Sequence, residues 1–184
     1  MALSPGWSGR PGRPSLERLL VSAVEHPSVL GGGRFGPDRT HAITVDADGV
    51  VVGDALRALL RGVPAMVSVM LANNETGVVQ PIREIAEVVH EAGGLLHVDA
   101  VQAPGRVACD FNNLDADLMT LSSHKIGGPK GVGALIAKAG LHLHEPLIAG
   151  GGQERGLRGG TENVAGIAGF GAAAADIASQ RATE

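Results

Sequence analysis

The sequence predicts an α/β fold, a mixed and mostly parallel sheet with helices on both faces. Short apolar runs typical of buried strands alternate with helical segments along the chain. Hydrophobic residues make up 44% of the 184 residues and charged residues 18%, as in an ordered domain with a real core. Polar side chains follow several of the apolar runs, and ligands bind beyond the carboxyl ends of strands in such sheets.

The elements follow one another in the order that this fold requires. Asp54 lies near the start of the first long helix and Gly62 follows its end, while Pro81 opens the second helix. Alanine-rich composition favours the third helix. Strands are expected at 19–24, 41–45, 65–71, 95–100, 133–138 and the first half of 118–125, and helices at 54–61, 82–91 and 163–180.

The domain organisation follows from composition. Residues 1–18, rich in Pro, Gly, Ser and Arg, are expected to be a disordered leader, and residues 19–184 a single, incomplete domain. The single cysteine, Cys109, excludes an internal disulfide and favours a reducing, cytoplasmic location.

Composition and the length of apolar runs argue against two classes of partner. A net charge of −4 gives no electrostatic footprint for nucleic acid, and three Phe, one Trp and no Tyr leave few stacking platforms. No apolar run is long enough to span a membrane. We therefore expect neither nucleic acid nor membrane as a partner.

The ends of two apolar runs carry the strongest chemical signal. The run that begins at Leu118 leads into two hydroxyls, an imidazole and the amine of Lys125, and a glycine-rich turn follows. Another run ends at Asp99, with Gln102 three residues beyond, and a buried acid is costly unless a cation pairs with it. Pyridoxal phosphate needs such a pair, a lysine for the Schiff base and an acid that keeps the pyridine nitrogen protonated. The alternative is a Lys–Asp ion pair at a sheet edge without a functional role.

Two further runs also end in polar side chains, His26 and Asn74. Four polar strand ends are harder to explain by packing than one, which favours a ligand site. Asn73 is assigned to turn chemistry. His142 and His144, with Glu145 beside them, have no further ligand at suitable spacing, so no metal site is expected.

Five motifs together resemble a known family. They are S-x-x-E-H, N-N-E-T-G, H-V-D-A-x-Q, S-x-H-K-x-x-G-P-K-G and G-G-G-Q-E-R-G-x-R-x-G-T. In this order they are similar to the cysteine desulfurases of the NifS/IscS type, in the class V aminotransferase superfamily. The resemblance implies the large domain of a fold-type-I pyridoxal-phosphate enzyme, and it runs from about Val21 to the last helix.

The resemblance implies roles for five residues around the cofactor ring. Lys125 would form the Schiff base, and Asp99 would pair with the pyridinium nitrogen. Gln102 and Asn74 would hydrogen-bond the phenolic oxygen. His26 would stack on the ring and act as an acid and base toward the substrate.

The phosphate contacts and the partners follow from the same resemblance. Ser122 and His124 would hold the phosphate, and Thr161 would reach the phosphate of a neighbouring subunit, which implies a homodimer. The implied reaction converts L-cysteine to L-alanine and passes sulfur on for iron–sulfur cluster or other sulfur-containing cofactor assembly. A sulfur-acceptor or iron–sulfur scaffold protein is then a further partner.

The chain departs from the family pattern in three places. The family's glycine/threonine phosphate loop should precede Val21, where this chain has its Pro/Gly-rich leader. The family's nucleophilic cysteine and its carboxylate-binding arginine lie beyond the last helix, whereas the chain stops at Glu184. Cys109 lies where the family has no catalytic thiol and is assigned a structural role.

We therefore expect a partial domain without the small C-terminal domain, inactive or only partly active. Two alternatives stay open. One is another class V enzyme, a selenocysteine lyase or an aminotransferase, and the other is a non-catalytic fragment that binds the cofactor or another subunit.

Overall fold

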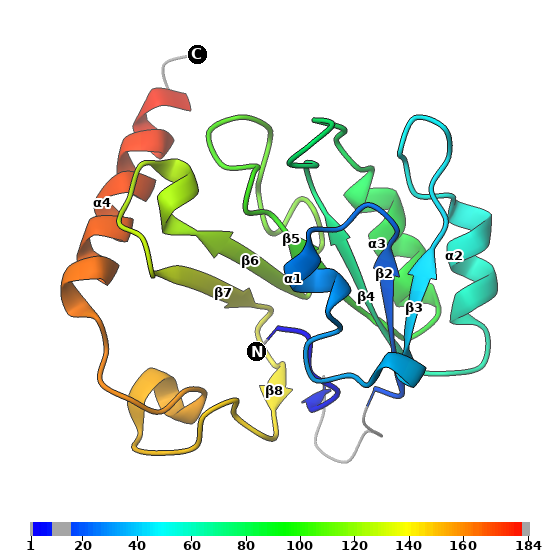
Figure 1. Cartoon of the computed structure of the whole chain (residues 1–184), viewed down its shortest axis with the longest axis horizontal. Helices are drawn as coiled ribbons and strands as arrows, with labels where there is room; N and C mark the ends of the chain where they lie inside the picture. Colours follow the sequence, from blue (N-terminus) through cyan, green and yellow to red (C-terminus); the bar gives the residue numbers. More distant parts are fainter. Residues whose placement is uncertain (1, 9–15, 182–184) are drawn as a thin grey trace.

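A six-stranded sheet forms the centre of the computed structural model, which describes residues 2–8 and 16–181 (Figure 1). The strand order is β3-β2-β4-β5-β6-β7; all neighbouring pairs are parallel except β6 and β7. This confirms the predicted mixed and mostly parallel sheet. The strands are β2 (Arg18–Ser22), β3 (Thr40–Ile43), β4 (Ala65–Met70), β5 (Leu95–Asp99), β6 (Leu118–Ser122) and β7 (Gly133–Ala137).

Two amphipathic helices cover one face of this sheet. Helices α2 (Gly53–Leu60) and α3 (Ile82–Glu91) bury side chains such as Leu56 and Ile85 in one cluster with Val67 of β4. Apolar residues recur at helical spacing along α3, and its bounds agree with the sequence prediction. Burial of this apolar face holds the helix on the sheet.

Shorter elements cover the other face. The four-residue helix α1 (Pro27–Leu30) contributes Val29 to a second cluster with Leu19 and Met66, and the 3-10 turn η1 (Pro37–Arg39) follows it. Helix α1 was not predicted, because its segment is rich in glycine. Helices therefore lie on both faces, as predicted, although α2 and α3 share one of them.

Residues 2–8 differ from the expected disordered leader. Strand β1 (Trp7–Ser8) pairs antiparallel with β8 (His142–Leu143), and the Trp7 side chain is 1% exposed. Trp7 and Leu3 join the second apolar cluster, and this anchoring orders a segment whose Pro/Gly content suggested mobility. Residues 1 and 9–15 of the leader lie outside the described residues.

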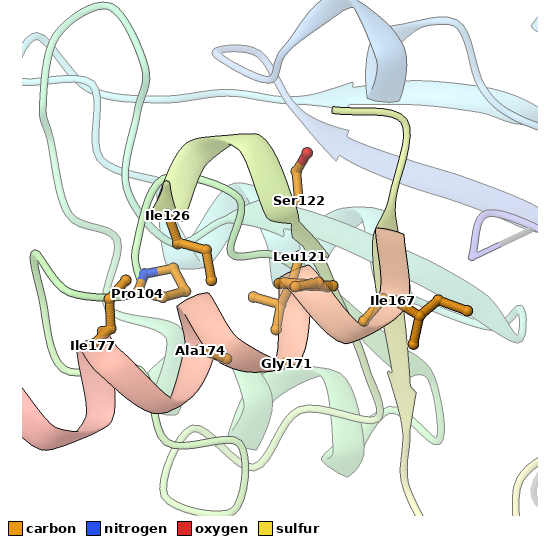
Figure 2. A pocket seen from close by; sticks show the side chains of 10 residues that line it. Pro104, Leu121, Ser122, Ile126, Ile167, Gly171, Ala174 and Ile177 are labelled. Atoms are coloured by element: carbon orange, nitrogen blue, oxygen red, sulfur yellow. The ribbon is translucent and has the colours of Figure 1, made fainter. Parts of the chain in front are cut away.

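Helix α4 (Val164–Arg181) lies beside the β6–β7 edge of the sheet (Figure 1). An apolar cavity of about 380 Å³ separates it in part from these strands. Figure 2 shows Leu121 of β6 directed at α4, whereas the hydroxyl of Ser122 points away from the helix. Alternation along β6 thus sends Ser122 to the opposite face.

None of the described helices combines the length and apolar character that a membrane-spanning helix needs.

Candidate functional site

A cavity of about 340 Å³ lies where β2, β4, β5 and β6 reach their carboxyl ends. Parallel strands bring their carboxyl ends to one edge, so residues far apart in sequence meet there. Seven of the eight predicted site residues line it; Thr161 does not. The lining residues are His26, Ser28, Met70, Asn74, Asp99, Val101, Gln102, Ser122, His124 and Lys125.

Lys125 brings an amine to this cavity. It lies on the 3-10 turn η2 (Ser123–Ile126), which continues β6 and ends at Gly127 in a left-handed conformation, φ 84°. No hydrogen bond or ion pair joins the Lys125 amine to any residue that the structure describes. The alternative of a Lys125–Asp99 ion pair is therefore not realised.

Arg106 ties the two loops that carry Lys125 and Gln102. Its guanidinium donates to the Lys125 carbonyl oxygen at 3.2 Å and to the Gln102 carbonyl oxygen at 3.3 Å. These bonds fix the backbone of Lys125 relative to the loop after β5.

Asp99 offers a buried carboxyl that pairs with no cation among residues 2–8 and 16–181. Its residue is 8% exposed, and its Oδ1 accepts a hydrogen bond from the Val101 N–H at 3.0 Å. Burial raises the pKa of Asp99, while the Val101 N–H and the nearby His26 partly oppose that rise. A protonated ring nitrogen would supply the missing cation, so the unpaired carboxyl and the unpaired amine in one cavity fit pyridoxal phosphate.

His26 is held by the start of helix α1. It is the N-cap residue, and its Nδ1 accepts a hydrogen bond from the Ser28 N–H at 3.2 Å. The Ser28 hydroxyl lies 2.8 Å from the same nitrogen. Because Nδ1 is an acceptor, the neutral ring carries its proton on Nε2.

Ser122 and His124 form a polar pair at the end of β6. The Ser122 hydroxyl lies 2.8 Å from Nδ1 of His124. Their assignment as phosphate contacts stays a prediction, as does that of Asn74, whose amide donates to the Glu75 carboxylate at 2.7 Å. Thr161 lies exposed in the segment before α4, and its predicted contact to a second subunit also stays a prediction.

A polar row of two buried side chains and the half-buried Thr120 lies beneath the cavity and was missed by sequence reasoning. His97 Nδ1 lies 2.8 Å from the Ser68 hydroxyl, and its Nε2 lies 3.1 Å from the Thr120 hydroxyl. Burial lowers the pKa of His97 to about 3, so the imidazole between Ser68 and Thr120 is neutral. Each of the three lies two residues before a cavity residue on its own strand. This regularity becomes visible only when the alignment of neighbouring strands is known.

Glu25 is the second residue that sequence reasoning missed. It belongs to the S-x-x-E-H motif, but no role was assigned to it. The side chain is buried beside the cavity and accepts hydrogen bonds from two strands. An acid directly before the predicted His26 was the available signal.

Three residues outside the cavity have structural contacts. Asn73 bonds the Val24 carbonyl and accepts two backbone N–H bonds in its turn, in agreement with the predicted turn chemistry. Cys109 packs, partly buried, against the apolar cluster under α2 and α3. His144 lies 2.8 Å from the Ser8 hydroxyl, across the β1–β8 pair.

The chain is similar to known proteins in both sequence and structure. The model of the family described as aminotransferase class-V matches residues 16–184. A cysteine desulfurase of Gluconacetobacter diazotrophicus is 48% identical over 160 residues, which are 85% of this chain and 40% of that protein. A cysteine desulfurase of Frankia sp. is 49% identical over 173 residues, 88% of this chain and 41% of that protein.

Solved structures agree with this result. A NifS-like protein from Rickettsia africae superposes with a TM-score of 0.82 at 39% identity, covering 88% of this chain and 45% of that one. SspA in complex with cysteine superposes with a TM-score of 0.78 at 35% identity, covering 87% and 47%. The chain therefore spans about 40% of the length of the curated relatives it matches.

Proposed function

The chain belongs to the class-V aminotransferase family, and on this basis we propose that it forms the cofactor-binding part of a pyridoxal-phosphate-dependent cysteine desulfurase. The two sequence relatives named above are cysteine desulfurases, and the family uses pyridoxal 5'-phosphate as its cofactor. One observation carries the proposal: the unpaired amine of Lys125 and the unpaired carboxyl of Asp99 line the same cavity.

Each chain residue then has a defined task. Lys125 supplies the amine for covalent attachment, and Asp99 supplies the negative charge opposite the ring nitrogen. Gln102 and Asn74 offer amides to the phenolic oxygen. When bound, pyridoxal phosphate supplies an electron sink for the reacting carbon of an amino acid.

The polar residues at the cavity rim complete the site. Ser122 and His124 offer a hydroxyl and an imidazole to the phosphate. His26 holds a proton on Nε2 above the cavity and moves it to or from the substrate. Its orientation is set by Ser28, which occupies the opposite nitrogen.

L-Cysteine is the proposed substrate, since the matching SspA structure is a complex with cysteine. A homodimer, with Thr161 contacting the phosphate of the second subunit, and a sulfur-acceptor protein belong to the same proposal. A cytoplasmic location suits a chain with one cysteine.

Titration with pyridoxal phosphate tests the proposal. The wild-type chain should give a visible absorbance band that Lys125→Ala abolishes. Lys130→Ala, in the glycine-rich turn five residues on, is the matched control and should retain the band. A band of equal strength in Lys125→Ala would overturn the assignment.

Sulfide release from L-cysteine separates turnover from binding alone. We expect little or no sulfide from this chain, because Cys109 packs outside the cavity and no other cysteine is present. Lysine-dependent binding without sulfide supports the assignment as the cofactor-binding part, whereas rapid sulfide release would contradict the absence of a nucleophile.

A further inference from the structure

Glu25 joins the ends of two strands through one oxygen. Its Oε1 accepts a hydrogen bond from the Ser22 hydroxyl at 2.6 Å and another from the Met70 N–H at 2.6 Å. Its Oε2 is buried and has no hydrogen-bond partner among the described residues. The residue is 5% exposed, so water does not replace the missing partner freely.

This carboxyl lies directly behind the wall of the cofactor cavity. Met70, which it binds, lines the cavity and pairs with Asp99 in the register of β4 and β5. His26 follows Glu25 in the chain and lines the same cavity. Glu25 therefore bonds the backbone of one cavity residue, Met70, and directly precedes a second one, His26, in the chain.

The two acids oppose each other's charge. Burial is the main cause that raises the pKa of Glu25 to about 7; the negative charge of Asp99 adds to the rise, and the bonds from Ser22 and Met70 reduce it. His26 acts in turn on Asp99. Two neighbouring buried carboxyls without a cation do not both ionise readily.

We propose that Glu25 is a positioning residue that holds the proton of this acidic pair on Oε2 and so leaves Asp99 free to carry the negative charge toward the cavity. Its Oε1 already accepts two hydrogen bonds, which leaves Oε2 for the proton. The same Oε1 fixes β2 to β4 and thereby sets His26 and Met70 at the cavity. The role of this arrangement in cofactor binding rests on the proposed function, whereas the location of the proton on Glu25 does not.

Carbon-13 NMR titration of side-chain carboxyls in the cofactor-free chain tests where the proton lies. One carboxyl of glutamate should titrate near neutral pH and be absent in Glu25→Gln. In Asp99→Asn its midpoint should fall, because the neighbouring negative charge is gone. Glu91→Gln, at the exposed end of α3, is the control and should leave the midpoint unchanged. A Glu25 midpoint in the ordinary acidic range, or one insensitive to Asp99→Asn, would overturn the proposal.

Affinity for pyridoxal phosphate tests the positioning. Glu25→Gln keeps an acceptor for Ser22 and Met70 and should bind within about threefold of wild type, whereas Glu25→Ala should bind about tenfold more weakly. Equal weakening in both variants would contradict the role of Oε1. If the wild-type chain binds no cofactor, the proposed function fails while the NMR titration still decides where the proton lies.

Discussion

The acidic residues at the two ends of the sheet differ in whether a basic side chain pairs with them. At the amino end of β6, Asp117 accepts hydrogen bonds from the Leu96 N–H and from His90, both at 2.8 Å. Asp115 pairs there with Lys138 at 2.8 Å. At the carboxyl end, neither Asp99 nor Glu25 forms an ion pair with any residue that the structure describes.

The difference separates a stabilising end from a binding end. The hydrogen bond from Lys138 is the largest of the effects that lower the pKa of Asp115, so its charged form is favoured in the fold. Burial raises the pKa of Asp99 and Glu25, so the fold favours their charged forms less than an unfolded chain does. Buried acids without a cation at this edge reduce stability, and together with the Lys125 amine they leave partners for a ligand.

The largest expected effect is on cofactor affinity at the binding end. Asp99→Asn removes a hydrogen bond to a charged group, worth about 1.5–3 kcal/mol, and should weaken pyridoxal-phosphate binding about ten- to a hundredfold. Asp117→Asn should leave the affinity unchanged. Titration by absorbance measures both, and equal losses in the two variants would remove the distinction between the ends.

The pH dependence of stability sharpens the comparison. The pKa of Glu25 is raised from 4.5 to about 7, so the folded state binds more protons than the unfolded state between these values. Its contribution to stability is complete below pH 4.5 and is lost as pH rises through 7. Wild type should therefore lose stability relative to Glu25→Gln over this range, by at most about 1.4 kcal/mol per pH unit.

Urea unfolding of the two proteins from pH 4.5 to 8 measures this difference. Titrating groups that do not interact with Glu25, such as Asp115, cancel because both proteins contain them. A stability difference that does not change with pH would place the pKa of Glu25 in the ordinary acidic range.

A smaller effect is expected at the stabilising end. Asp117→Asn weakens the bond to His90 and should lower the free energy of unfolding by about 1–3 kcal/mol. Asp99→Asn should not lower it, because a buried unpaired acid is removed. Chemical unfolding at neutral pH measures both variants, and the reverse order would show that Asp99 has a stabilising partner.

The smallest effect is expected for the exposed pair. The Lys138 side chain is 46% exposed, and solvent screens its attraction to Asp115. Lys138→Met should lower the free energy of unfolding by about 0.2–1 kcal/mol and leave cofactor affinity unchanged. A larger loss would mean that Lys138, Asp115 and His90 act as one network.

The residues at the strand ends could be predicted from the sequence, whereas the polar residues behind them could not. Strand ends are visible as apolar runs that stop at polar residues, which is why Asp99 and Lys125 could be placed together. The unpaired state of both groups was not predictable, because a Lys–Asp ion pair has the same pattern. Glu25 and the Ser68–His97–Thr120 row depend on strand register, and a single sequence does not encode register visibly.

The prediction for residues 2–8 was wrong for a different reason. Pro and Gly around Trp7 suggested disorder, yet burial of one large side chain and pairing with β8 order residues that composition alone describes as mobile.

Borohydride reduction in the presence of pyridoxal phosphate, followed by peptide mass spectrometry, tests the central claim most directly. The chain has three lysines, Lys125, Lys130 and Lys138, of which Lys125 lines the cavity. We expect the cofactor on Lys125 in wild type and, in Asp99→Asn, reduced labelling of the same residue. Equal labelling of the three lysines would contradict a prepared cofactor site at the carboxyl end of the sheet.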